Sequence, residues 1–214
     1  MDSDSKRSAF EELSSGHRPL TSGEPVPVYI SYAWDIATIA WVDELERALP
    51  PALRLLRDKN EVRPGGWIST FMQDIGRAQH VVVVLSTKYL QSQYCMRELL
   101  YLHGRSLGDR AELMGRIVPV VMEDLMISDG MSRLMHVLHW QEKHDALHAM
   151  ANKAGIAAAG GAARDELLAM KDFVHHTDEL LSWLNDVLMP RPRKGDGQST
   201  IQAVITLLLE RMNR

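Results

Sequence analysis

Short apolar runs alternate with longer amphipathic segments along most of the chain. The strand signals are runs rich in β-branched and aliphatic residues at 27–32, 53–57, 80–86, 116–122 and 137–140. Between and after them, apolar residues recur at helical spacing over 36–49, 67–79, within 88–105, over 126–135 and over 165–188. This alternation predicts an α/β fold, a flavodoxin-like three-layer arrangement around a five-stranded parallel sheet.

Individual residues refine this pattern. The run at 80–86 is unbroken in its apolar character, which predicts a central strand covered on both faces. Pro119 lies inside the strand signal at 116–122 and favours an edge position or a local irregularity, because proline cannot donate to a sheet. Asp35 is placed to cap the helix at 36–49, and Pro50 and Pro51 end that helix.

The same pattern divides the chain into three parts. Residues 1–24 are rich in Ser, Gly and charge and predict a flexible leader, and residues 25–188 hold the folded domain. Residues 189–214 comprise a Pro- and Arg-rich linker and an amphipathic helix at 200–212. That helix either packs on the domain or belongs to a further sensor module or partner. The stretch 145–164, with its Ala- and Gly-rich segment, predicts an insertion.

Composition narrows the class of protein. A formal net charge of −4 argues against binding nucleic acid or an anionic membrane. Cys95 is the single cysteine, so neither an intramolecular disulfide nor a zinc site made of cysteines can form. The N-terminus lacks the apolar core of a signal peptide, and no apolar run approaches the roughly 20 residues of a membrane span. We therefore expect a cytoplasmic protein that does not contact membranes.

Histidines occur in pairs that raise the question of a metal. They are His136 with His139, His144 with His148, and His175 with His176. Two histidines at positions i and i+4 can share one helix face, but no companion carboxylate motif of the metalloprotease type accompanies them. We therefore expect no metal site.

Three segments lie where a parallel sheet of this kind binds ligands. Such sheets bind beyond the carboxyl ends of their strands, at the point where strand order reverses. Residues 31–35, 58–66 and Ser86 with the start of the next helix fall at that edge. The site is therefore sought there.

Four segments, in this order and spacing, resemble the Toll/interleukin-1 receptor (TIR) domain family in its bacterial branch. They are 28–35 (Val-Tyr-Ile-Ser-Tyr-Ala-Trp-Asp), Arg57-Asp58 with Pro64-Gly65, 81–86, and 89–99 with its Tyr-Leu, Ser, Tyr-Cys and Glu-Leu elements. The resemblance covers about 160 residues. It implies the TIR fold.

The resemblance also implies a function. Many TIR domains cleave NAD⁺ with a glutamate on the third helix, often in antiphage defence and upon assembly with other TIR domains. Glu98 matches that catalytic residue, and NAD⁺ would be a substrate, with no cofactor required. A G-x-G-x-x-G fingerprint is absent, in keeping with that role for NAD⁺. The residues implied to contact substrate are Tyr32, Ala33, Trp34, Arg63, Gly65, Ser86 and Tyr94.

Physical chemistry supports the pair Tyr94 and Glu98. Their i, i+4 spacing places both on one face of a helix. A carboxylate can stabilise the oxocarbenium-like ribose formed when the nicotinamide bond breaks. Nicotinamide leaves as a neutral molecule, so one carboxylate suffices where ordinary glycosidases need two. A neighbouring aromatic ring offers a surface for stacking.

Alternatives remain open at this level. The protein is an NAD⁺ glycohydrolase releasing nicotinamide and ADP-ribose or a cyclic form, an enzyme that makes an ADP-ribose-derived messenger, or a non-enzymatic TIR adaptor. Glu98 can also be an ordinary solvated helix residue, Ser86 can simply end its strand, and the loop at 63–66 can be a plain turn. In the family resemblance that loop gates the site and mediates self-assembly.

Overall fold

A computed structural model describes residues 24–57, 74–155, 160–187, 190–192 and 197–212. In these residues the sheet has four strands, β1 (Val26–Tyr32), β2 (Leu53–Leu56), β3 (Val81–Leu85) and β4 (Ile117–Val121). Their order is β2-β1-β3-β4, and every pairing is parallel. The predicted α/β class with a parallel sheet is confirmed, with four strands in place of the expected five.

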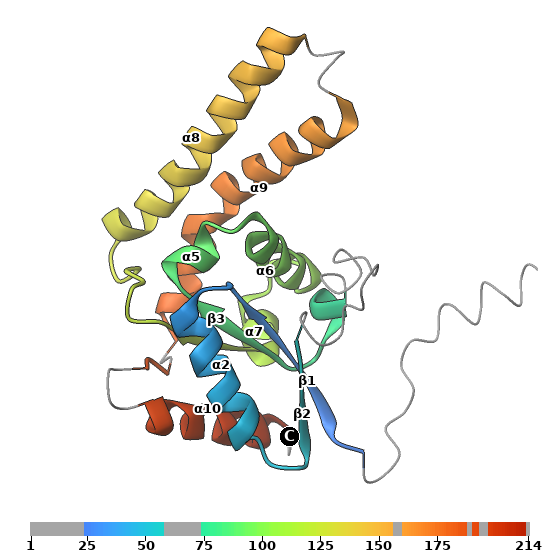
Figure 1. The fold of residues 1–214 in the computed structure, drawn as a ribbon, viewed down its shortest axis with the longest axis vertical. Helices are drawn as coiled ribbons and strands as arrows, with labels where there is room; N and C mark the ends of the chain where they lie inside the picture. Colours follow the sequence, from blue (N-terminus) through green and yellow to red (C-terminus); the bar gives the residue numbers. More distant parts are fainter. Residues whose placement is uncertain (1–23, 58–73, 156–159, 188–189, 193–196, 213–214) are drawn as a thin grey trace, which may run out of the picture.

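Helices cover both faces of the sheet. They are α2 (Ile36–Ala48), α5 (Thr87–Leu90), α6 (Gln93–Arg105), α7 (Arg110–Arg116), α8 (Gly130–Ala154), α9 (Gly160–Asn185) and α10 (Gly197–Met212). Apolar side chains of α2 and α10 join one core cluster, whereas those of α5, α6, α7 and α9 join the other. Figure 1 shows α8 and α9 as a hairpin that projects beyond the sheet. The result is three layers.

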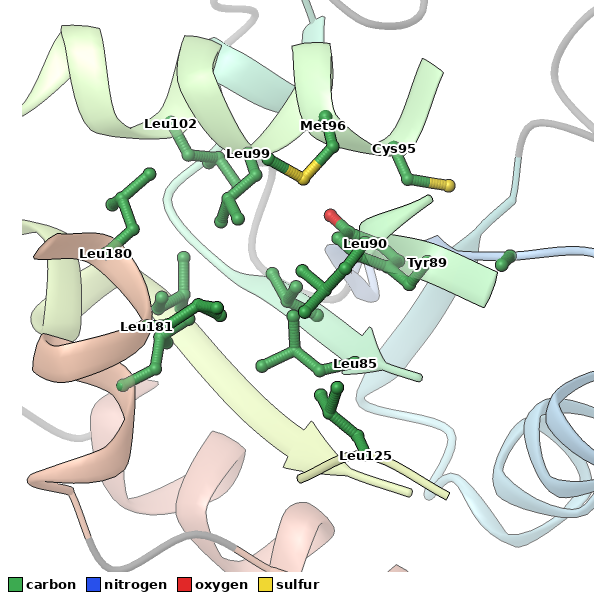
Figure 2. Packing of buried hydrophobic residues seen from close by; sticks show 14 of the residues in the cluster. Leu85, Tyr89, Leu90, Cys95, Met96, Leu99, Leu102, Leu125, Leu180 and Leu181 are labelled. Carbon is green, nitrogen blue, oxygen red and sulfur yellow. The ribbon is translucent and has the colours of Figure 1, made fainter. Parts of the chain in front are cut away.

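The central strands build both cores through the two-residue alternation of a β-strand. Val81, Val83 and Leu85 of β3 face α6 and α9, whereas Val82 and Val84 face α2 and α10. All five residues are fully buried, so the predicted central strand is confirmed. Figure 2 shows the first core, in which Met96, Leu99 and Leu102 of α6 lie above Leu85, beside Leu180 and Leu181 of α9.

The predicted fifth strand at 137–140 is wrong. These residues lie in the middle of α8, where Trp140 is buried and Leu138 is half exposed. An apolar run of four residues does not distinguish a strand from a buried turn of helix. Residues 137–140 are helical because they lie within the longer helix α8. The expected insertion at 145–164 consists largely of the end of α8 and the start of α9, with 156–159 outside the described residues.

The outer side of β4 explains why a fifth strand is missing and why a proline is tolerated at position 119. Among the described strands β4 stands at the end of the sheet, so the predicted edge position of Pro119 is confirmed. At this edge the Val121 amide donates to the Pro190 carbonyl at 3.2 Å. That contact occupies part of the place a fifth strand would take.

The C-terminal helix packs on the domain. Ile201, Val204, Ile205 and Leu208 of α10 are buried against the sheet and α2. Arg211 donates from its guanidinium to the carbonyls of Ile117 (2.7 Å) and Met114 (2.9 Å). The apolar stripe that suggested a partner therefore completes the core. None of the described helices is long and apolar enough to cross a lipid bilayer.

Candidate active site

The site lies where the direction of chain progress across the sheet reverses. β1 pairs with β2 on one side and with β3 on the other, so the reversal falls between β1 and β3. In open parallel sheets this is the position at which ligands bind, beyond the carboxyl ends of the strands. Ser31 stands near the end of β1, Ser86 directly follows β3, and α6 packs against β1 with Glu98 in its second turn.

Glu98 is buried and held by a chain of hydroxyl groups. Its side chain Oε2 accepts a short hydrogen bond from Ser31 Oγ, and Ser31 Oγ lies 2.7 Å from the hydroxyl of Tyr89. Glu98 is 7% exposed and Tyr89 is fully buried. Burial, and then the neighbouring Cys95 and Glu98, raise the pKa of Tyr89 well above its usual value. Tyr89 therefore stays protonated at neutral pH.

The direction of these hydrogen bonds follows from counting protons. A serine hydroxyl carries one hydrogen, and Ser31 gives it to the carboxylate of Glu98. The contact between Ser31 and Tyr89 must then be donated by the tyrosine. The chain from Tyr89 through Ser31 to Glu98 fixes a carboxylate at the ligand-binding edge of the sheet.

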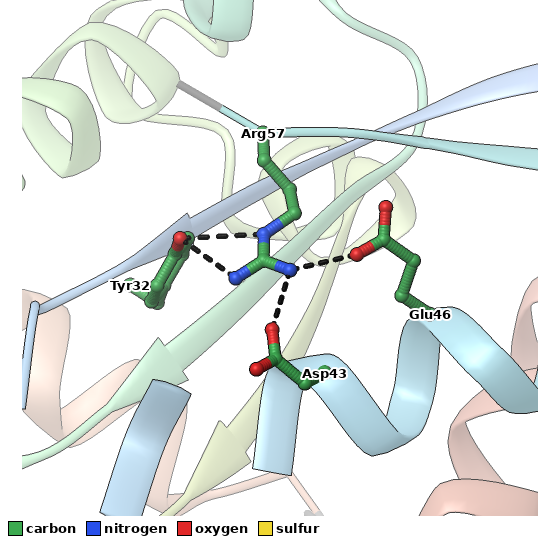
Figure 3. A network of polar contacts seen from close by, with 4 residues as sticks. All are labelled: Tyr32, Asp43, Glu46 and Arg57. Atoms are coloured by element: carbon green, nitrogen blue, oxygen red, sulfur yellow. Dashed lines mark hydrogen bonds and ion pairs between the residues drawn. The ribbon is translucent and has the colours of Figure 1, made fainter. Parts of the chain in front are cut away.

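Strand alternation places Ser31 and Tyr32 on opposite faces of the sheet. Tyr32 belongs to the core on the α2 side, away from Glu98. Its hydroxyl accepts from Arg57 Nε (3.3 Å) and Nη2 (3.1 Å), and Arg57 Nη1 lies 2.7 Å from both Asp43 and Glu46 of α2. Figure 3 shows this network around the end of β2. The Tyr32 side chain thus stabilises the fold, so the contact with substrate that was predicted for Tyr32 would have to come from its backbone.

The other predicted residues differ in their surroundings. Trp34 is 64% exposed and Tyr94 is 60% exposed, whereas Ala33, the residue after β1, is buried in the core that α6 and α9 cover. Ser86 is buried and caps α5, since its Oγ accepts from the Tyr89 amide at 3.1 Å. This capping role satisfies Ser86 structurally. Arg63 and Gly65 lie outside the described residues, as does the rest of their loop.

Local sequence signals fix the start of the helix that carries Glu98. Ser92 caps α6 by accepting from the Cys95 amide, and Cys95 is buried with its Sγ 3.7 Å from the Tyr32 carbonyl. Cys95 is therefore a core residue. The predicted helix within 88–105 is divided at residues 91–92 into α5 and α6.

Ser31 is the residue of the candidate site that sequence reasoning did not single out. It lay within the predicted site segment, but its side chain was given no role. Its signal was the alternation of β1, in which the residues at 28, 30 and 32 face α2 and Ser31 faces the opposite helices. A polar side chain on a buried strand face requires a partner, and that partner is Glu98.

The family resemblance implies that Glu98 cleaves NAD⁺. On that expectation, replacing Ser31 with alanine should lower the turnover number for NAD⁺ by about 10- to 100-fold, the range for a lost hydrogen bond to a charged group. The Michaelis constant should change less, because Ser31 orients Glu98. Steady-state kinetics on Ser31→Ala and Tyr89→Phe test this, and Tyr89→Phe should have the same sign and a smaller size. An unchanged turnover number in Ser31→Ala would exclude this role.

Comparison with known proteins identifies the family to which this fold belongs. Residues 28–151, more than half of the chain, match a protein family described as the TIR domain, and the chain belongs to that family.

A solved structure supports the fold independently. It is described as the activated Roq1 resistosome directly recognizing the pathogen effector XopQ (TIR domains), and it superposes with a TM-score of 0.56. The match has 19% sequence identity and covers 86% of this chain and 99% of that one. No curated protein matches the sequence significantly.

Proposed function

We propose that this TIR domain is an NAD⁺ glycohydrolase in which Glu98 acts on the bond between nicotinamide and ribose. The observation that carries the proposal is the buried Glu98 carboxylate, held by Ser31 at the reversal point of a parallel sheet. Burying a carboxylate in a fold is costly unless it is hydrogen-bonded, and a scaffold has no need of one at this edge. A buried, hydrogen-bonded carboxylate at the edge where parallel sheets bind ligands is a candidate for a functional group.

The chemistry requires little beyond that carboxylate. The C1′–N bond breaks with its electron pair leaving on the nicotinamide nitrogen, which neutralises the pyridinium. The ribose acquires positive charge, and the Glu98 carboxylate stabilises it. Water then attacks C1′ and loses a proton, giving ADP-ribose. Attack on C1′ by a nucleophilic group of the same ADP-ribosyl unit in place of water, with loss of a proton, gives a cyclic form.

Exposed aromatic residues flank this position in the sequence. Trp34 follows β1 and Tyr94 lies one helical turn before Glu98, and both present most of their side chains to solvent. Flat apolar surfaces of this kind suit the stacking of a nicotinamide or adenine ring. Arg63 and Gly65 lie outside the described residues and are proposed as substrate contacts on the family resemblance alone.

The cellular role in this proposal is that of a cytoplasmic immune effector. Assembly with other TIR domains would complete each site, and NAD⁺ depletion or an ADP-ribose product would carry the response. The Roq1 structure is described as an activated resistosome, which is consistent with TIR domains working in assemblies.

Product analysis tests the function directly. The protein is incubated with NAD⁺ over a range of protein concentrations, with and without a crowding agent, and the products are separated by chromatography. We expect nicotinamide to appear in step with the loss of NAD⁺, at a specific activity that rises with protein concentration. A conjugated or cyclic product in place of ADP-ribose would indicate the messenger enzyme. No consumption under any condition would leave the adaptor function.

A further inference from the structure

A second cluster of reactive side chains lies between two helices that pack together. His103 comes from α6, and His176 and Glu179 come from α9. One ring nitrogen of each histidine and one carboxylate oxygen of Glu179 all lie within 4.8 Å of one another. These residues are distinct from the chain of groups around Glu98, and of the three only His176 belongs to a histidine pair considered in the sequence.

Two nitrogen atoms in this cluster lack hydrogen-bond partners. Among the described residues, Nε2 of His103 and Nδ1 of His176 are buried without a partner. The two rings lie 5.1 Å apart between centroids and are tilted by 50°. Buried polar groups in native proteins are almost always satisfied, so unpaired nitrogens side by side call for a ligand that both can bind.

The geometry of the helices supports this. The i, i+3 spacing of His176 and Glu179 places both on one face of α9, next to His103 on the neighbouring helix. Two imidazoles and one carboxylate form a ligand set that proteins use for zinc. Imidazole nitrogen favours zinc and other late transition metals over magnesium and calcium, which prefer oxygen ligands alone.

We propose that His103, His176 and Glu179 form a three-ligand site for a divalent transition-metal ion of the zinc type, which ties α6 to α9. Tetrahedral zinc with bonds of about 2.0–2.1 Å requires ligand atoms roughly 3.3 Å apart. Closing the cluster from 4.8 Å therefore takes a small side-chain rotation, and Glu179 is exposed and able to make it. A water molecule fills the fourth position.

Such an ion would restrain α6, the helix that carries Glu98. His103 follows Glu98 on α6, so a metal bridge to α9 restrains the helix that positions the carboxylate. Binding to the folded state alone also stabilises the protein by mass action. The proposal concerns metal binding and folding, and it holds whether or not the protein cleaves NAD⁺.

The test uses the full chain, freed of metal with a chelator and then dialysed. Zn²⁺ is titrated by calorimetry, and Co²⁺ serves as a spectroscopic probe because its visible absorption reports tetrahedral coordination. We expect one tight site per chain and a rise in Tm with added Zn²⁺. Glu179→Gln should weaken the affinity at least about tenfold, and His103→Ala or His176→Ala should weaken it further.

Two features of the design keep the result clear. Glu179 is exposed, so its substitution should leave the apo protein as stable as the parent and isolates metal binding from folding. The double variant His144→Ala/His148→Ala is the matched control, because these helical histidines stack with ring centroids 6.0 Å apart and lie outside the three-residue cluster. Loss of the tight site in that control, or no change in Glu179→Gln and His176→Ala, would overturn the proposal.

Discussion

Replacing Glu98 with glutamine should reduce NAD⁺ cleavage by about 100- to 1,000-fold, the range for losing one electrostatic contact to a transition state. Glutamine keeps the shape of glutamate, and its amide oxygen can still accept from Ser31. What it loses is the negative charge that stabilises the developing positive charge on the ribose. The expected result is therefore loss of turnover in a protein that folds normally.

The measurement is the initial rate of nicotinamide release at saturating NAD⁺, with a thermal melt of each variant. Glu112→Gln is the matched control, because Glu112 lies on the exposed surface of α7 and should leave the rate unchanged. If Glu98→Gln retains the parental rate while NAD⁺ is consumed, the carboxylate that performs the chemistry is a different one.

The four strands of the sheet were predictable because the local composition of each segment favours a strand. The valine run of β3 is buried on both faces, and the edge position of Pro119 follows from its missing N–H. Asp35 caps α2 by accepting from the Thr38 amide at 2.9 Å, as its sequence position indicated. Preferences of this kind depend on a few neighbouring residues, so the folded protein shows the same local structure that the sequence predicts.

The departures from prediction depend on packing between distant segments. Whether 137–140 becomes a strand depends on what occupies the free edge of β4, and the carbonyl of Pro190 does so. α7 lies in a stretch for which no element was predicted, and its buried Leu113 and half-buried Met114 pack it against the core. Such outcomes are decided by tertiary contacts that no short window of sequence contains.

The candidate site also has a part that was predictable from local sequence and a part that depends on packing between distant segments. The spacing within α6 predicted Glu98 as the candidate, but its partner Ser31 lies 67 residues away. Whether Ser31 or Tyr32 faces Glu98 depends on which side of the sheet each residue of β1 points to. A shift of the strand register by one residue would exchange the two sides. His103 and His176 likewise meet only because α6 packs on α9.

Replacing Trp140 with alanine should lower the free energy of unfolding by about 3–5 kcal/mol, the usual cost of deleting a buried large aromatic side chain. Trp140 is 1% exposed, and its ring lies 4.6 Å from that of Phe173 on α9. Its Nε1 donates to the carbonyl of Leu90 at 2.8 Å. The change leaves a cavity and an unpaired carbonyl between α8 and α5.

Urea unfolding followed by circular dichroism measures this loss. Met150→Ala on the exposed surface of the same helix is the control and should change stability by about 0.5 kcal/mol or less. Trp140→Phe keeps most of the packing and removes the N–H, so its cost should fall between the two. Equal stabilities of Trp140→Ala and Met150→Ala would contradict the anchoring role.

Trp140 also connects the α8–α9 hairpin to the candidate site. It holds Leu90, the neighbour of Tyr89, and Tyr89 donates the hydrogen bond that orients Ser31 toward Glu98. Trp140→Ala should therefore lower the turnover number at temperatures where the protein is still folded, and Trp140→Phe should lower it less. An unaltered turnover number in folded Trp140→Ala would show that α5 holds Tyr89 in place without support from the hairpin.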